Sequence, residues 1–155
     1  MANTYTQIYM HIIFAVGHRD SLISNAWREE LYRYIAGACQ NRKHHVIAVN
    51  GTHDHVHVFI GMNPSDSVAT LVQSLKVQSS RWINERYMHG KFHWQSGYGA
   101  FSYMLSAVPK VKAYVDNQQE HHRHVPFAEE VRIMFEKAGI AYEPAFLMKG
   151  FPESH

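Results

Sequence analysis

The side chains best suited to do chemistry in this chain are histidines clustered in the segment HDHVHVFI, at positions 53–60. If this segment is a β-strand, its side chains alternate between two faces, and His55 and His57 therefore project from the same face. Two imidazoles with this spacing can share one metal ion, and histidine is the commonest metal ligand in proteins. The alternative is that these are simply exposed histidines beside a turn, in a chain that contains 13 histidines. The spacing alone leaves both interpretations open.

A second chemical feature is the segment YVDNQ, in which Tyr114 and Gln118 are four positions apart. On a helix, residues with this spacing share one face. A tyrosine can be a nucleophile that forms a covalent intermediate, but its ordinary pKa, about 10, means that it needs help, for example from a metal ion. Gln118 offers a neutral oxygen that could complete a metal site with the two histidines. The competing interpretation is that Tyr114 only packs, as most helical tyrosines do.

Other polar residues lie close to these two motifs in the sequence. Asp54 could orient one of the histidines by accepting a hydrogen bond from its ring, although a turn-forming aspartate is the simpler interpretation. His121, His122 and His124 follow the tyrosine; they could contact a phosphate, but we expect them to be exposed. Because a metal site needs neutral imidazoles, we expect activity to fall below about pH 6.5.

Residue patterns predict the elements that must position these groups. The aromatic and β-branched segment 5–16 is predicted to be a strand. Two further strands, 44–50 and 55–61, are predicted to form a hairpin. Segment 91–103, which contains Gly97 and Gly99, is predicted to be a strand or a hairpin. Helices are predicted at 26–42, from Asp66 or Ser67 onward, at about 107–122 with Pro109 in its first turn, and at 127–138. We expect Asn25 to cap the first helix and Gly139 to end the last.

The order of these elements predicts the class of fold. Strands and helices alternate as β-α-β-β-α-β and are followed by further helices, with an irregular or packed tail from 140 to 155. This order is typical of an α+β, ferredoxin-like (RRM-like) split βαβ sandwich, with a mainly antiparallel sheet and helices packed on one face.

Composition indicates a single domain that spans residues 1–155. With 46% hydrophobic and 18% charged residues, the chain can bury a core, and it has no apolar run near the roughly 18 residues of a membrane span. The N-terminus lacks the features of a signal peptide, so we expect a cytoplasmic location.

The single cysteine, Cys39, excludes an intrachain disulfide and a multi-cysteine zinc site. The net charge of +2 indicates nucleic-acid binding only weakly.

Several segments, taken in order, give the chain a specific resemblance. It resembles the HUH single-tyrosine transposases, the TnpA proteins of the insertion-sequence 200/605 group, over roughly residues 5–145. The segments that carry the resemblance are YTQIYMHIIFAV, HDHVHVFI, LVQSLKVQSSRWIN, WQSGYGAFS, YVDNQQEHH and FAEEV. The His-hydrophobic-His motif alone is weak, whereas all of these segments in order are specific.

The resemblance implies an activity and a site. Such enzymes cut and rejoin single-stranded DNA without hydrolysis, through a 5′-phosphotyrosine that leaves a free 3′-OH. By position, Tyr114 matches the nucleophile on an added C-terminal catalytic helix, His55 and His57 match the metal-binding pair, and Gln118 matches the third protein ligand. The metal would be Mg²⁺ or Mn²⁺, and the DNA would carry hairpins near the ends of the element.

The resemblance also implies a homodimer in which the tyrosine helix of one subunit can complete the histidine pair of the other. A small sheet leaves edge strands that a symmetric interface can pair. The segment 95–102, with Gly97 and Gly99, could serve as the hinge that carries this helix away from its own core. The alternative is that these glycines only shape a hairpin and that the helix stays on its own chain.

Candidate DNA contacts are less specific. Basic residues on and after the first two helices could bind the phosphate backbone: Arg28, Arg33, Arg42, Lys43, Lys76 and Arg81. Each of these alone is more often a solvated surface charge. Tyr98 and Phe101 could stack on unpaired bases, but packing in the core is the default expectation for aromatic residues.

Three rival functions remain at this stage. The first is a domesticated relative that processes repetitive palindromes; such relatives tend to carry extra basic C-terminal sequence, whereas the tail YEPAFLMKGFPESH is short and not basic. The second is a non-catalytic module that binds single-stranded nucleic acid on its sheet. The third is a zinc- or nickel-binding histidine protein with no role on nucleic acid.

Overall fold

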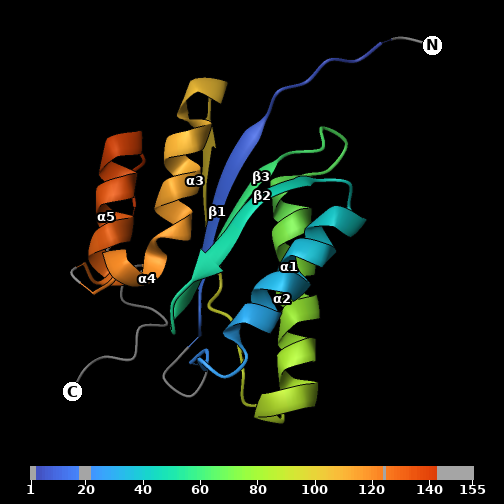
Figure 1. The fold of residues 1–155 in the computed structure, drawn as a ribbon, viewed down its shortest axis with the longest axis vertical. Coiled ribbons are helices and arrows are strands. Elements are labelled where there is room, and N and C mark those ends of the chain that lie inside the picture. The colour runs from blue at the N-terminus through green and yellow to red at the C-terminus, as the bar shows by residue number, and fades with distance from the viewer. Residues whose placement is uncertain (1–2, 18–21, 124, 143–155) are drawn as a thin grey trace.

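A four-stranded antiparallel sheet forms the centre of the molecule, and helices cover it on both sides (Figure 1). The computed structural model describes residues 3–17, 22–123 and 125–142. The strands are β1 (Tyr9–Ala15), β2 (His45–Gly51), β3 (His55–Gly61) and β4 (Gly99–Tyr103). The helices are α1 (Arg28–Asn41), α2 (Val68–Ile83), α3 (Val108–Asp116), α4 (Gln118–His121) and α5 (Phe127–Ala138), with a π-helical turn at Asn84–Met88 and a 3₁₀ turn at Leu105–Ala107.

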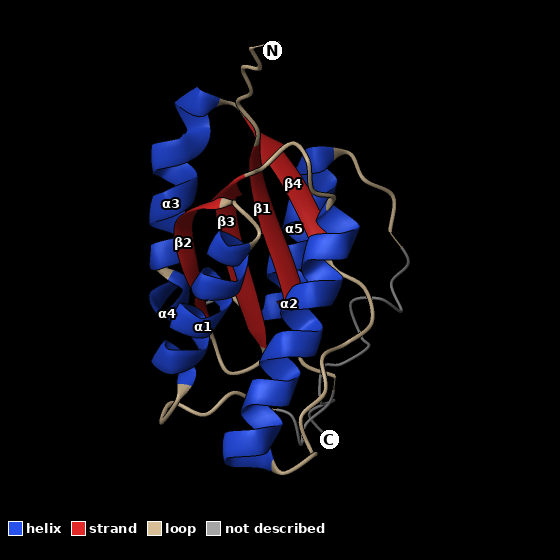
Figure 2. Ribbon diagram, turned by 90° about the vertical axis from the view of Figure 1, so that its right-hand side faces the viewer, coloured by secondary structure: helices blue, strands red, loops and turns tan. Residues whose placement is uncertain are grey.

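The strand order is β2-β3-β1-β4, and each neighbouring pair is antiparallel. Together with the chain order β1-α1-β2-β3-α2-β4, this confirms the predicted α+β ferredoxin-like fold. The two helices of the sandwich, α1 and α2, pack on one face of the sheet as predicted, and the added helices α3, α4 and α5 cover the other face (Figures 1 and 2).

The larger hydrophobic core lies between the sheet and the α1–α2 layer. Because side chains alternate along a strand, the even-numbered residues of β1 and β3 face this layer. Ile12, Phe14, Val58 and Ile60 are all buried there against apolar residues of the two helices. Burial of each such side chain is worth about 1.5–3 kcal/mol, and this layer therefore carries most of the hydrophobic stabilisation.

The odd-numbered residues of the same strands face the other helical layer, and there the packing is mixed. One apolar cluster joins β1 and β4 to α5 through residues such as Ile13 and Phe135, and a second joins β2 and β3 to α3 through residues such as Phe59 and Val115. Three buried histidines lie on this face: His11 from β1, and His55 and His57 from β3. The polar site is thus built into the α3–α5 side of the sheet.

The first helix begins later than predicted. Asn25 is not its cap: α1 starts at Arg28, and the side-chain oxygen of Asn25 accepts a hydrogen bond from Arg28 Nη1 instead. Residues 25–27 form a turn, and Trp27 is buried there with its ring stacked 5.3 Å from that of Tyr87. The other caps are as expected, since Ser67 accepts a hydrogen bond from the backbone of Thr70 and Gly139 ends α5 with a positive φ of 69°.

The helix predicted at about 107–122 is two helices. α3 ends at Asp116, Asn117 leaves the helical conformation (φ −101°, ψ 23°), and α4 follows. The physical reason is Asn50 on β2, whose Nδ2 donates to the carbonyl oxygens of Val115 and Asp116 at 2.9 and 3.0 Å. Gln119 in turn donates to the side-chain oxygen of Asn50. These bonds anchor the end of α3 on the sheet.

Segment 91–103 forms one strand rather than a hairpin. β4 pairs with β1 along Gly99–Tyr103, and the chain before it is held by Lys76, whose Nζ donates to the carbonyl oxygens of Gln95 and Gly97. In this arrangement Gly97 and Gly99 are tied to the body of the protein, and their role as a hinge stays a prediction. The first strand is also shorter than the predicted 5–16, and most of the predicted tail, 143–155, lies outside the described residues.

No helix among the described residues combines the length and the apolar character that crossing a membrane requires.

Replacing Asn50 with Ala should detach the α3–α4 junction from β2. The change removes the donor to two backbone carbonyls, so we expect the free energy of unfolding to fall by about 1–3 kcal/mol. Amide hydrogen exchange in α4 should become faster at the same time. Asn41→Ala, at an exposed position that ends α1, is the matched control in urea titrations. Equal stability of the two variants would show that the bonds of Asn50 do not hold the junction.

Candidate functional site

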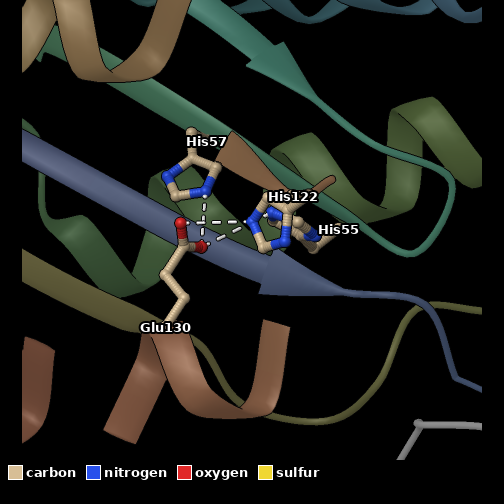
Figure 3. Close-up of side chains that lie close together, drawn as sticks. All are labelled: His55, His57, His122 and Glu130. Atoms are coloured by element: carbon tan, nitrogen blue, oxygen red, sulfur yellow. Dashed lines mark hydrogen bonds and ion pairs between the residues drawn. The ribbon is translucent and has the colours of Figure 1, made fainter. Parts of the chain in front are cut away.

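His55 and His57 are the centre of a buried polar site on the α3–α5 side of the sheet. Both side chains are fully buried, and their ring centroids lie 5.0 Å apart. The prediction that they share one face of a strand is confirmed, and the alternative of exposed histidines is wrong for this pair. Figure 3 shows how the two rings converge with His122 and Glu130, which come from after α4 and from α5.

Each of these two histidines is held at its Nδ1 atom. His55 Nδ1 lies 2.7 Å from Asp54 Oδ1 and 2.9 Å from Thr52 Oγ1. His57 Nδ1 lies 2.7 Å from Nε2 of His11, and the rings of this pair stack. Asp54 therefore lies in the turn, as expected, and also orients His55. With Nδ1 fixed in both rings, Nε2 of each histidine faces the interior of the site.

The carboxylate of Glu130 lies opposite these Nε2 atoms (Figure 3). Its Oε1 is 3.1 Å from His57 Nε2 and 3.6 Å from His55 Nε2. Its Oε2 is 3.0 Å from His121 Nε2 and 3.1 Å from His122 Nε2. The expectation that His121 and His122 are simply exposed was wrong, because both rings turn inward to this carboxylate; His124 lies outside the described residues.

Tyr114 and Gln118 both reach the site, although the helix is interrupted between them. The hydroxyl of Tyr114 donates a hydrogen bond to Glu130 Oε2, and its ring lies edge-on to that of His57, with centroids 5.7 Å apart. Gln118 is buried, its Oε1 is 3.2 Å from His55 Nε2, and its Nε2 donates to the carbonyl oxygen of Tyr114. The two residues of the YVDNQ motif thus meet the histidine pair.

The surroundings shift the pKa values of these groups in opposite directions. Burial lowers the pKa of His57 to about 4, although the bond to Glu130 works against this shift. Burial would raise the pKa of Glu130, but the neighbouring imidazoles of His122 and His57 outweigh it and hold that pKa below its usual range. Burial and the charge of Glu130 raise the pKa of Tyr114 above its ordinary value. At neutral pH the imidazole of His57 is therefore neutral, and the phenol of Tyr114 is protonated and weakly nucleophilic.

The donor atoms of the site fit a divalent metal ion. One ligand atom from each of His55, His57, His122 and Glu130 can be chosen so that all lie within 4.8 Å of one another. Imidazole nitrogen with carboxylate or amide oxygen is a set that binds divalent transition ions. A buried carboxylate beside a neutral His57 also leaves negative charge that a cation would offset.

The six basic residues predicted to contact DNA lie on or next to α1 and α2, across the sheet from the histidines. Three of them have partners within the chain: Arg28 donates to the side-chain oxygen of Asn25, Arg42 forms a two-pronged pair with Asp66 at 2.8 and 2.7 Å, and Lys76 donates to backbone carbonyls. Phe101 is buried in the core, whereas Tyr98 is exposed. These positions do not test a DNA contact, which stays a prediction.

Residues 4–118 match a family model described as Transposase IS200 like. The chain belongs to this family. Two solved structures share the fold of this IS200-like transposase. A candidate transposase from Deinococcus radiodurans R1 is 19% identical with a TM-score of 0.60, and the alignment covers 76% of this chain and 96% of that one. A REP-associated tyrosine transposase bound to a REP hairpin is 13% identical with a TM-score of 0.54, and the alignment covers 79% of this chain and 71% of that one. No curated protein gave a significant match.

The family match covers the histidine pair, Tyr114 and Gln118, and it ends before Glu130. Sequence reasoning missed Glu130 and His11. For Glu130 a signal existed, because it lies three residues after Phe127 and directly before Val131, on the face of α5 that is buried. A carboxylate in that position is unusual and marks a special environment. Nothing in the sequence distinguishes His11 from the other histidines.

The pKa of His57 makes stability depend on pH in a defined window. Unfolding returns this imidazole to its ordinary pKa of about 6.5, so below that pH the unfolded chain binds a proton that the folded chain does not. We expect His57 to reduce the free energy of unfolding of the metal-free protein by about 2 kcal/mol between pH 7.5 and pH 5. The sequence predicts that activity falls below about pH 6.5; because the pKa of His57 is about 4, we expect this histidine to become protonated only near pH 4.

Urea titrations at the two pH values test this, with His57→Gln as the reference because other histidines add to the slope. The variant should lose less stability than the wild type between pH 7.5 and pH 5. The same pH slope in both proteins would show that His57 is not held neutral in the folded state.

Proposed function

We propose that this IS200-like transposase cuts and rejoins single-stranded DNA at insertion-sequence ends through a covalent 5′-phosphotyrosine on Tyr114. The observation that carries the proposal is the position of the Tyr114 hydroxyl, which lies at a buried carboxylate directly beside the His55–His57 pair. A tyrosine that only packed would not need its hydroxyl directed into a cluster of possible metal ligands. The family match supports a transposase, and the phosphotyrosine chemistry goes beyond it.

The proposed reaction exchanges one phosphate ester for another. The Tyr114 oxygen attacks the phosphorus of a backbone phosphodiester, forming an O–P bond, and the bond from phosphorus to the 3′-oxygen breaks. The phenol loses its proton and the leaving 3′-oxygen gains one, so no water is consumed. Because the ester is conserved, the same step in reverse can join a new 3′-OH, and no nucleotide cofactor is needed.

The raised pKa of Tyr114 means that the site must provide help for this attack. We propose that His55, His57 and Gln118 hold a divalent ion, Mg²⁺ or Mn²⁺. When bound, this ion polarises the scissile phosphate and offsets the negative charge that develops on it. Imidazole ligands favour Mn²⁺ over Mg²⁺ by intrinsic affinity, so metal availability decides which is used in the cell.

For the DNA we propose single strands that carry hairpins, met in the cytoplasm of a bacterial or archaeal cell. The REP-associated transposase that shares this fold was solved bound to a hairpin, which supports this class of partner. Among the predicted contacts, Arg33, Lys43 and Arg81 are exposed and Arg28 is half-buried, and these four are the ones that we assign to the phosphate backbone. Arg42 and Lys76 would have to exchange their present partners to take part.

We further propose that the working unit is a homodimer with active sites shared between subunits. In the single chain, α3 lies on its own sheet, next to its own histidines. The short connection from β4 to α3 exposes two apolar side chains, Met104 at 72% and Leu105 at 53%. This connection lies directly before α3, and α3 could move about it to the equivalent place on a second chain.

Tyr114→Phe should abolish the covalent product. The change removes one hydroxyl, so the fold and DNA binding should persist while no SDS-resistant adduct forms with labelled single-stranded DNA and Mn²⁺. Tyr5→Phe, at an exposed position, is the control and should give the wild-type yield. A normal adduct in the Tyr114 variant would remove this residue as nucleophile, and absence of adduct in the wild type would refute the proposed activity.

Mixing two inactive proteins distinguishes shared from separate sites. One protein carries Tyr114→Phe, and the other carries His55→Ala with His57→Ala. After subunit exchange, sites shared between chains should restore adduct on the histidine-deficient chain, which keeps its tyrosine. If sites form within each chain, no mixture regains activity. A monomer by light scattering at micromolar concentration would refute the dimer itself.

A further inference from the structure

We propose that Glu130 is itself a ligand of the metal ion, and that its second oxygen holds the nucleophile. Its Oε1 would join His55 and His57 on the ion, while Oε2 accepts the hydrogen bond of the Tyr114 hydroxyl. One carboxylate would then connect the ion directly to the attacking tyrosine. This inference rests on the metal-dependent function proposed above, and it concerns a residue beyond the part of the chain that the family model matches.

The burial of Glu130 is the first reason. Only 3% of the residue is exposed, although it occupies the middle of a helix face that otherwise packs apolar side chains such as Phe127 and Val131. A buried carboxylate is costly unless positive charge or several hydrogen bonds compensate it. Its neighbours here are imidazoles and one phenol, and no lysine or arginine is among the partners of its carboxylate in the described part of the chain. A bound cation would add the positive charge that no lysine or arginine supplies to this carboxylate.

The hydrogen-bond geometry of the histidines, which sets their tautomer, is the second reason. Asp54 and His11 lie 2.7 Å from the Nδ1 atoms of His55 and His57, respectively. A neutral His55 therefore carries its proton on Nδ1, toward the carboxylate of Asp54, and its Nε2 presents a lone pair to the site. His57 would adopt the same tautomer when it binds the ion, donating from Nδ1 to His11 and giving up any hydrogen bond from Nε2 to Glu130.

In that tautomer, the lone pairs of the histidine Nε2 atoms face oxygen atoms across the site. His55 Nε2 lies 3.2 Å from Gln118 Oε1 and 3.6 Å from Glu130 Oε1. The orientation of the Gln118 amide is fixed independently, because its nitrogen donates to the carbonyl oxygen of Tyr114. Acceptors that face one another at these distances repel, unless a cation lies between them.

The spacing of the donor atoms is the third reason. Two ligand atoms that each lie about 2.1 Å from one ion, with a right angle between their bonds to it, are about 3 Å apart. The distances of 3.1 Å from Glu130 Oε1 to His57 Nε2 and 3.2 Å from Gln118 Oε1 to His55 Nε2 match this spacing. A carboxylate among the ligands also suits Mg²⁺ and Mn²⁺, which prefer oxygen, better than a site with imidazoles alone.

Calorimetric titration with MnCl₂ in the absence of DNA tests the assignment. Glu130→Gln keeps the shape of the side chain but removes its charge, and we expect it to weaken Mn²⁺ binding by about 10-fold or more. Glu129→Gln makes the same change at the neighbouring exposed position and should bind Mn²⁺ as the wild type does. Equal Mn²⁺ affinity in Glu130→Gln and wild type would overturn the proposal, and so would a wild type that binds no Mn²⁺.

A second variant covers the case in which Glu130→Gln does not fold. Glu130→Asp keeps the charge but withdraws the carboxylate by one methylene group, so it should also weaken Mn²⁺ binding, and unchanged affinity would overturn the assignment. Because the readout is metal binding, it separates this inference from the proposed function. A wild type that forms the Tyr114 adduct while Glu130→Gln binds Mn²⁺ normally refutes only the role of Glu130. Weakened Mn²⁺ binding in that variant, with no adduct in wild type, refutes only the DNA chemistry.

Discussion

A buried carboxylate among imidazoles is the interaction around which this transposase site is built. Glu130 approaches from α5, and its two oxygens contact groups from β3, α3 and the segment after α4. A carboxylate in that position cannot be left without compensation, so the elements that carry its partners must lie close together. Burial keeps His57 neutral against the opposing effect of Glu130 on its pKa, and burial together with Glu130 keeps Tyr114 protonated. The site is thus poised for a cation, and the tyrosine remains weakly nucleophilic without one.

The sheet makes this arrangement possible through its two unequal faces. The face toward α1 and α2 is wholly apolar at its centre and provides stability. The opposite face divides its apolar contacts between α3 and α5, and the histidines lie where these two clusters meet. Strand alternation sends neighbouring residues of β3 into different layers, so a rigid hydrophobic core directly supports the buried histidines.

Local patterns in the sequence were enough to predict the ferredoxin-like order of elements and the shared face of His55 and His57, because strand and helix periods are local properties. The break at Asn117 was not predictable, since it depends on Asn50, more than sixty residues earlier in the chain. The role of His11 depends likewise on which strands become neighbours in the sheet. Glu130 stood out only as a charge on an apolar helix face, and its partners could not be named before α5 was placed on the sheet.

Anomalous diffraction from crystals soaked in Mn²⁺ would test the centre of this account most directly, because it locates the ion without reference to activity. We expect one manganese peak, within bonding distance of Nε2 of His55, Nε2 of His57 and a carboxylate oxygen of Glu130, about 2.0–2.3 Å from each. A peak bound by the histidines and Gln118 with Glu130 turned away would contradict the role of the carboxylate. The lack of any peak at the histidine pair would contradict the metal site as a whole.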